Sequence, residues 1–235
     1  MTPPSCTPVT QSCLPDFASG PTVPRVTRYV NNLDLLSFCT AQLARFKDRD
    51  ADIIFICDSI TQHWIDGTGK NVWDANFALP NTLDFGIAGD ATQDVLWRLD
   101  NYPIPHLHHK VAVVLVGTNN EHNTAPEISA GFKAVLTTTQ RIFPGVKIIL
   151  VSIMPNRCAN DLMMAADSIL RTYADKQSIY YLDLVPFMTP LGDNWKGLGP
   201  DRLHPNAAGY QLRTDAMLPL LNKLLTQTTA SSTGP

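Results

Sequence analysis

Apolar and polar residues follow one another along this chain in two rhythms, one typical of strands and one typical of helices. Short apolar runs predict five buried strands, at residues 52–57, 82–87, 111–116, 147–153 and 179–183. The run at 111–116, Val-Ala-Val-Val-Leu-Val, is continuous, β-branched and uncharged, as strands buried on both faces are. Apolar positions at helical spacing predict helices at 32–47, from 60 onward, from about 90, and at 125–143, 160–176 and 206–225.

The alternation of strands with helices predicts the α/β class. A parallel five-stranded sheet covered by helices on both faces accounts for this pattern, with the doubly wound strand order 2-1-3-4-5. The length of 235 residues suits one large domain, expected at residues 26–225. The Pro-, Thr- and Ser-rich residues 1–25 are expected to form an extended arm, and residues 226–235 a flexible tail.

Composition and charge narrow the class of partner. A net charge of −3 gives no basic footprint for nucleic acid or for a membrane surface. No apolar run approaches the roughly 20 residues that cross a bilayer. No cleavable signal is recognisable at the start of the chain.

The cysteines bear on the compartment. No pair has Cys-x-x-Cys spacing, so a structural zinc site is not expected. A bridge between Cys6 and Cys13, or between one of them and Cys39, would stabilise the arm in an oxidising compartment, and unpaired surface thiols are the alternative. The arm favours a secreted or periplasmic protein over a cytoplasmic one.

Polar residues follow the predicted strands where each strand leaves the sheet. Ser59 follows the first strand, Gly89 the second and Asn119 the third, and the carboxyl ends of these strands are neighbours in the order 2-1-3-4-5. His204 is the best candidate base for a serine nucleophile, and Asp201, three residues earlier, can orient its imidazole. The backbone N–H groups of Ser59 and Gly89 and the amide of Asn119 are candidate donors to the oxyanion formed when an ester is attacked.

Each of these residues also has a simpler interpretation. Ser59 and Gln62 fit a helix capping box, and Asp201 with His204 fits an ordinary turn. Gly89 and Asn119 are common turn residues. Their arrival in order after predicted strands, at one edge of one sheet, favours a hydrolytic site.

The same residues resemble the sequence blocks of SGNH (GDSL-type) hydrolases. The matching segments are Asp58-Ser59-Ile60-Thr61-Gln62, Gly89-Asp90, Gly117-Thr118-Asn119-Asn120 and Asp201-x-x-His204-Pro205. Residues 85–99 and the Gly-Thr-Asn-Asn block resemble in particular the α-subunits of platelet-activating-factor acetylhydrolase and their bacterial relatives. The resemblance implies a flavodoxin-like three-layer α/β/α fold and a serine esterase without metal or other cofactor. It also implies Ser59 as nucleophile, His204 and Asp201 as the rest of the triad, and Gly89 and Asn119 as donors of the oxyanion hole, in addition to the N–H of Ser59 inferred above.

One position departs from that family, which has glycine where this chain has Cys57. At a positive φ the substitution would cost about 1–2 kcal/mol, whereas on ordinary β backbone the thiol would pack as a small apolar group. We expect activity to be kept and the acyl pocket to be narrowed.

The expected substrate is a small-molecule or carbohydrate ester with a short acyl group, acetyl above all. Longer-chain lysophospholipase or thioesterase action and a non-catalytic glycan-binding module are the alternatives. Candidate substrate contacts are Asp58, Cys57, His122 and Trp195. The histidines at 106, 108 and 109 are interpreted as a surface loop rather than a metal site. The oligomeric state is expected to be monomer or homodimer.

Overall fold

The computed structural model describes residues 20–25, 37, 40–41, 44, 50–77, 81–101, 107–154, 159–187, 190–191, 194–195 and 197–231. The disulfides predicted for Cys6, Cys13 and Cys39 lie outside these residues. Most of the helix predicted at 32–47 does as well, although the described positions 37, 40, 41 and 44 are helical.

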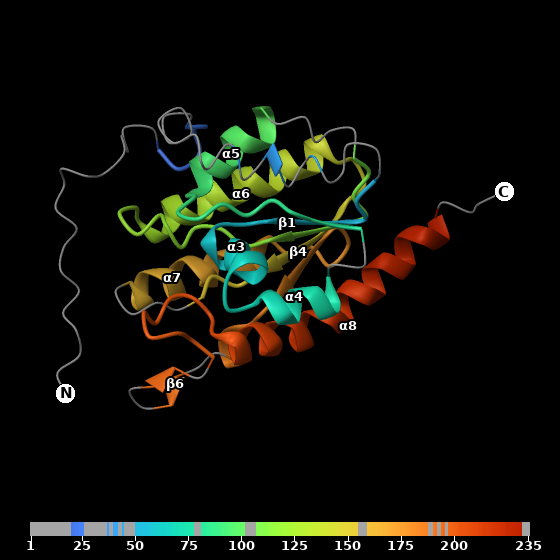
Figure 1. The fold of residues 1–235 in the computed structure, drawn as a ribbon. Coiled ribbons are helices and arrows are strands. Elements are labelled where there is room, and N and C mark those ends of the chain that lie inside the picture. The colour runs from blue at the N-terminus through green and yellow to red at the C-terminus, as the bar shows by residue number, and fades with distance from the viewer. Residues whose placement is uncertain are drawn as a thin grey trace.

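A five-stranded parallel sheet forms the centre of the protein (Figure 1). Its strands are β1 (Ile53–Ile56), β2 (Thr82–Asp84), β3 (Val111–Val114), β4 (Lys147–Val151) and β5 (Ile179–Leu182). They lie in the order β2-β1-β3-β4-β5, and every neighbouring pair is parallel. The predicted fold class and strand order are confirmed, and each strand ends one to three residues earlier than its apolar run.

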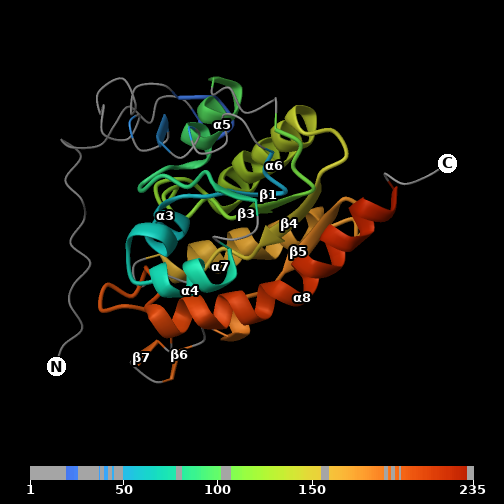
Figure 2. The same ribbon diagram turned by 45° about the vertical axis from the view of Figure 1, so that its right-hand side comes forward.

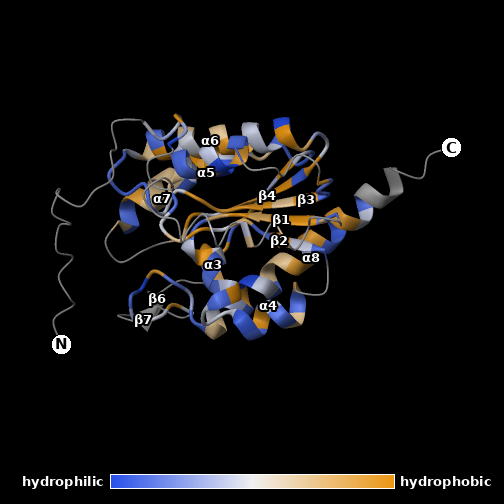
Figure 3. Cartoon of the chain, turned by 45° about the horizontal axis from the view of Figure 1, so that its top comes forward, coloured by the Kyte–Doolittle hydropathy of each residue, from blue (hydrophilic) through white to orange (hydrophobic). Residues whose placement is uncertain are grey.

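Helices cover both faces of the sheet (Figure 3). One face packs against α5 (Thr92–Asn101), α6 (Ala125–Ile142) and α7 (Asn160–Leu170). The other packs against α3 (Ser59–Asp66), α4 (Lys70–Asn76) and α8 (Ala207–Ser231), which lie together in Figure 2.

The strands supply both hydrophobic cores through their two-residue period. In β1, Ile54 and Ile56 point into the core under α5, α6 and α7, while Ile53 and Phe55 point into the core under α3, α4 and α8. All four side chains are at most 2% exposed. Burying a large aliphatic or aromatic side chain stabilises a fold by about 1.5–3 kcal/mol, so β1 is tightly held just before Ser59.

Some helix boundaries differ from the prediction. The segment after Gly69, for which no element was predicted, forms the additional helix α4 (Lys70–Asn76), which buries Trp73. Helix α7 ends at Leu170 and continues as one 3-10 turn to Tyr173, short of the predicted residue 176. Helix α8 continues to Ser231, beyond the predicted end at 225. The two-residue strands β6 (Pro190–Leu191) and β7 (Asn194–Trp195) form a small antiparallel pair that was not predicted.

Residues 20–25, the described part of the predicted arm, lie against α5. The guanidinium of Arg25 pairs with the buried carboxylate of Asp94, and the Thr92 hydroxyl donates to the carbonyl of Pro21 at 2.8 Å. Gly131 on α6 makes room for this segment, because a Cβ there would lie 2.8 Å from the Pro21 carbonyl oxygen. Among the described helices, none is long and apolar enough to cross a membrane.

Candidate active site

Ser59 occupies the first position of α3, directly beyond the buried end of β1. The helix is capped by Asp58, whose side chain accepts the N–H of Ile60 at 2.9 Å. The alternative in which Ser59 serves as the helix cap is therefore wrong, and Gln62 instead accepts the N–H of Ala88. The N–H of Ser59, at the first position of a helix, has no partner inside that helix. The serine amide is thus left without an acceptor among the described residues, and the hydroxyl takes no part in capping the helix.

His204 and Asp201 reach Ser59 from a tight turn before α8. Asp201 accepts the N–H groups of Leu203 at 3.0 Å and His204 at 3.1 Å, and Arg202 takes a φ of 55° to close the turn. Asp201 Oδ2 lies 2.7 Å from His204 Nδ1, and His204 Nε2 lies 2.9 Å from Ser59 Oγ.

These contacts determine the imidazole tautomer. An ionised carboxylate only accepts hydrogen bonds, so His204 Nδ1 carries the proton that it donates to Asp201. In the neutral ring, Nε2 is then an acceptor, and the Ser59 hydroxyl donates to it. Burial works to raise the pKa of Asp201, but the hydrogen bonds from the His204 side chain and from two backbone N–H groups hold it below its ordinary value. The carboxylate therefore stays ionised at neutral pH.

Gly89 and Asn119 meet where the loops after β2 and β3 run side by side. Gly89 has a φ of 78°, which favours glycine, and among the described residues its N–H has no hydrogen-bond acceptor. Asn119 Nδ2 donates to the carbonyl of Asp90 at 2.9 Å, which leaves its second N–H available. Ser59, Gly89 and Asn119 thus follow three neighbouring strands, and each has an N–H group without an acceptor among the described residues.

Arg98, which sequence reasoning missed, connects the segments that follow β1 and β2. Its guanidinium donates to the Asp90 carboxylate at 2.7 Å and to the carbonyls of Phe85 at 2.6 Å and Cys57 at 3.3 Å. The side chains of Arg98 and Asp90 are both completely buried. One cation on α5 therefore joins the ends of β1 and β2 to the loop that carries Gly89.

Asn120 performs a similar task for the loop after β3. Its Oδ1 accepts the N–H of Thr92 at 3.0 Å, and its Nδ2 donates to Gln93 at 3.0 Å. Asn120 is fully buried. In the Gly-Thr-Asn-Asn block, Asn120 therefore anchors the loop to α5 and Asn119 donates to the loop after β2.

The four predicted substrate contacts differ in their exposure. Cys57 and Asp58 are at most 1% exposed. The φ of Cys57 is not positive, so its backbone is unstrained, and its thiol packs in the core under α3, α4 and α8. His122 has a side chain 40% exposed, in the loop beyond Asn119, and the side chain of Trp195 lies outside the described residues.

Burial dominates the electrostatics behind the nucleophile. It raises the pKa of the Cys57 thiol, and the negative charge of Asp58 raises it further. It also raises the pKa of Asp58, against the opposing hydrogen bond from Ile60. The Cys57 thiol lies 3.6 Å from Asp58 Oδ1 as a weak donor, so its geometry is that of a structural residue and not of a second nucleophile.

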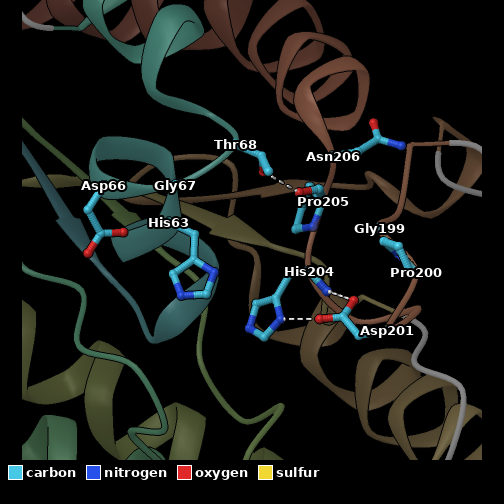
Figure 4. A pocket seen from close by; sticks show the side chains of 10 residues that line it. All are labelled: His63, Asp66, Gly67, Thr68, Gly199, Pro200, Asp201, His204, Pro205 and Asn206. Carbon is cyan, nitrogen blue, oxygen red and sulfur yellow. Dashed lines mark hydrogen bonds and ion pairs between the residues drawn. The ribbon is translucent and has the colours of Figure 1, made fainter.

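A cavity of about 620 Å³ opens beside His204 (Figure 4). Helix α3 and the loop after it provide one side, including His63, Asp66 and Thr68, and the turn before α8 provides the other. His63 was not predicted to belong to the site, because a lone histidine on a helix gives no distinguishing pattern. Among the described residues, no cluster of His, Cys, Asp and Glu is arranged to hold a metal ion. Of the three histidines predicted on a surface loop, His108 is exposed and pairs with Asp50. The prediction is wrong for His109, which is buried against the carbonyl of Ala51, and His106 lies outside the described residues.

Comparisons with known proteins identify the family of the chain and agree with its fold. The family model described as the GDSL-like lipase/acylhydrolase family matches residues 55–212. The human platelet-activating factor acetylhydrolase IB subunit alpha1 is 32% identical over 199 residues, which cover 79% of this chain and 81% of that protein. A GDSL-like lipase from Bacteroides thetaiotaomicron superposes with a TM-score of 0.63 at 19% identity, covering 81% of this chain and 98% of that one. A carbohydrate esterase family 3 protein from Talaromyces cellulolyticus superposes with a TM-score of 0.59 at 18% identity, covering 75% of this chain and 99% of that one.

Proposed function

Because the chain belongs to the GDSL-like lipase/acylhydrolase family, we propose that it is a serine esterase that removes short acyl groups, acetyl above all, from a hydroxyl-rich alcohol such as a carbohydrate. The observation that carries the proposal is the hydrogen-bonded chain from Asp201 through His204 to Ser59. A serine hydroxyl gains nucleophilic strength only when a base accepts its proton, and this chain supplies that base already oriented.

The reaction follows from the positions of the atoms. Ser59 Oγ attacks the ester carbonyl while its proton moves to His204 Nε2, and Asp201 stabilises the imidazolium that forms. The N–H groups of Ser59, Gly89 and Asn119 are available to the oxyanion. His204 then gives its proton to the leaving alkoxide, which departs as the alcohol and leaves an acyl group on Ser59. Water, deprotonated by His204, releases the acid and restores the serine.

The cavity beside His204 is the space nearest to the atom that protonates the leaving alcohol. His204 must reach the leaving oxygen to protonate it, and the cavity beside His204 is lined by Asp66, Thr68 and Asn206 together with glycine and proline residues. Asp66 and His63 offer polar groups to the hydroxyl groups of such an alcohol, and most of the exposed surface of the cavity is apolar. The preference for acetyl is supported by the name of the alpha1 relative, an acetylhydrolase.

A series of p-nitrophenyl esters from acetate to dodecanoate tests the proposal. We expect the highest kcat/KM on acetate, and Ser59→Ala should lower kcat by at least about 10³-fold, since the nucleophile and its base act as one unit. Ser168→Ala is the matched control, because Ser168 is an exposed serine that donates only to a carbonyl of its own helix. Turnover that peaks on long chains would replace the proposal with a lipase.

Covalent labelling gives an independent readout. A fluorophosphonate should add its mass to the peptide that contains Ser59 in the wild-type protein and not in Ser59→Ala. A wild type that neither turns over any ester nor takes the label would instead be a binding module without hydrolase activity.

A further inference from the structure

The ring of His63 lies against the ring of His204. The two ring centroids are 4.6 Å apart and the planes are inclined by 37°, and Figure 4 shows the two imidazoles next to each other on the wall of the cavity. His63 stands one helical turn after Ser59 on α3. The mechanism proposed above assigns it no task.

The hydrogen bonds of His204 leave part of its orientation open. They fix its two nitrogens, at 2.7 Å from Asp201 and 2.9 Å from Ser59. The tilt of the ring about the line through those nitrogens is not determined by them. Asp201 itself is on a surface turn, with its side chain 48% exposed. A flat group against the face of the ring would limit that tilt.

The helix that carries His63 is well suited to this task. Its neighbours Ile60 and Trp64 are completely buried, and the Tyr210 hydroxyl of α8 donates to the carbonyl of Ile60 at 2.8 Å. Because Ser59 and His63 share this rigid helix, the contact of His63 with the His204 ring links the position of the base to that of the nucleophile.

We propose that His63 is a positioning residue, whose neutral ring holds the His204 imidazole in place for proton transfer and whose protonation at acid pH opposes the reaction. This role rests on the esterase activity proposed above. It concerns the effect of His63 on His204, since the hydrogen bonds that carry the reaction do not involve His63.

The charges around His63 give the proposal its pH dependence. His63 faces His204 and Asp201 on the turn before α8 and Asp66 on its own helix. Burial lowers the pKa of His63, and repulsion from His204 lowers it further, while Asp66 and Asp201 offset part of the effect. At neutral pH His63 is therefore uncharged and does not resist the positive charge that His204 gains during the reaction. Below its pKa, His63 becomes a cation in contact with the His204 ring and disfavours the positive charge that His204 gains during the reaction.

Three substitutions separate packing from charge. His63→Ala removes the ring, His63→Phe keeps a flat ring that cannot be charged, and His63→Arg keeps a planar group that is always charged. The readouts are kcat and KM on p-nitrophenyl acetate from pH 4.5 to 9, with thermal unfolding as the check on folding. His108→Ala is the matched control, because His108 is a surface histidine with its side chain 84% exposed, paired with Asp50 before β3.

We expect His63→Ala to lower kcat about tenfold with little change in KM, as loss of positioning does. His63→Phe should recover most of that loss. Toward acid pH its kcat should fall with the slope of one proton, whereas the kcat of the wild type should fall more steeply because His63 is protonated as well. His63→Arg should be at least tenfold less active than His63→Phe at every pH.

Two results would overturn the role of His63. One is a folded His63→Ala with the kcat and acid limb of the wild type, and the other is equal activity in His63→Phe and His63→Arg. Both can be told from failure of the proposed function, because they require a wild type that turns over ester and loses turnover in Ser59→Ala. A wild type without turnover removes the proposed function, and the role of His63 with it.

Discussion

The buried Arg98 should contribute far more to stability than an exposed ion pair does. Its guanidinium contacts the Asp90 carboxylate and the carbonyls of Phe85 and Cys57, and both charged side chains are fully buried. Arg98→Met keeps much of the volume of the side chain but removes the guanidinium that pairs with the buried Asp90 carboxylate. Removing one partner of a buried pair typically costs about 3–5 kcal/mol, because the remaining charge has lost its solvation.

The expected loss of stability should be measurable as a lower melting temperature. In a chain of this size, each kcal/mol shifts Tm by about 2–4 °C, so Arg98→Met should lower Tm by about 6–20 °C. Urea unfolding should show the same loss as a lower midpoint with an unchanged slope. The double variant Arg98→Met with Asp90→Asn should lose less stability than the two single variants lose in total. The reason is that the charge that Arg98 neutralises is then absent.

Lys70→Met provides the control. Lys70 pairs with Asp74 one turn along α4, with side chains 58% and 50% exposed, and such pairs contribute about 0.5 kcal/mol or less. If Arg98→Met cost no more than Lys70→Met, the interpretation of Arg98 as the cation that joins the segments after β1 and β2 would be refuted.

Two further changes probe the core behind the nucleophile and the acid stability of the fold. Cys57→Gly should lower stability by about 1–2 kcal/mol, because packing is lost and backbone freedom is added. Its kcat/KM on short and long acyl esters should change less than about tenfold. A larger gain in kcat/KM on every chain length would mean that Cys57 impairs the site. Asp175→Ala should cost about 1 kcal/mol at pH 7, the size of a capping contact on an exposed surface, because the Asp175 carboxylate accepts the N–H groups of Gln177, Ser178 and Ile179. Burial works to raise the pKa of Asp175, but those hydrogen bonds hold it well below its ordinary value. This stabilisation is therefore complete above the unfolded pKa of about 3.9 and decreases as the pH falls toward the folded one. Urea midpoints of the wild type and Asp175→Ala that converge between pH 4 and 2 would agree with this, and a constant difference would contradict it.

The sheet could be predicted from the sequence because its signal is local. The run at 111–116 has no charge to place it at a surface, and the strand–helix alternation leaves few topologies for five parallel strands. The missed helix α4 has a local explanation as well. Gly67 and Gly69 are turn signals, and the seven residues of α4 are too few to show a helical period.

The site could be predicted only in part, for a different reason. Ser59, Gly89 and Asn119 could be located because each follows a strand, and strand order determines which strand ends are neighbours. Arg98 gave no such signal, because a charged residue on an amphipathic helix normally faces water, and only the folded chain shows that it faces inward. His63 was missed because its importance depends on the ring of a residue far away in the sequence. The catalytic roles of Ser59, Asp201 and His204 stay a prediction for the experiments above.

Residues 20–25 should be kept when the chain is shortened for expression. Composition alone places the start of the domain at residue 26, yet Arg25 neutralises Asp94 and donates its backbone N–H to the carbonyl of Gln93 at 3.0 Å. A shortened gene that begins at codon 26 would therefore encode a protein that lacks the cation for a fully buried aspartate. Trimming for crystallisation or expression should stop ahead of Gly20, so that what looks like a dispensable leader keeps its final six residues.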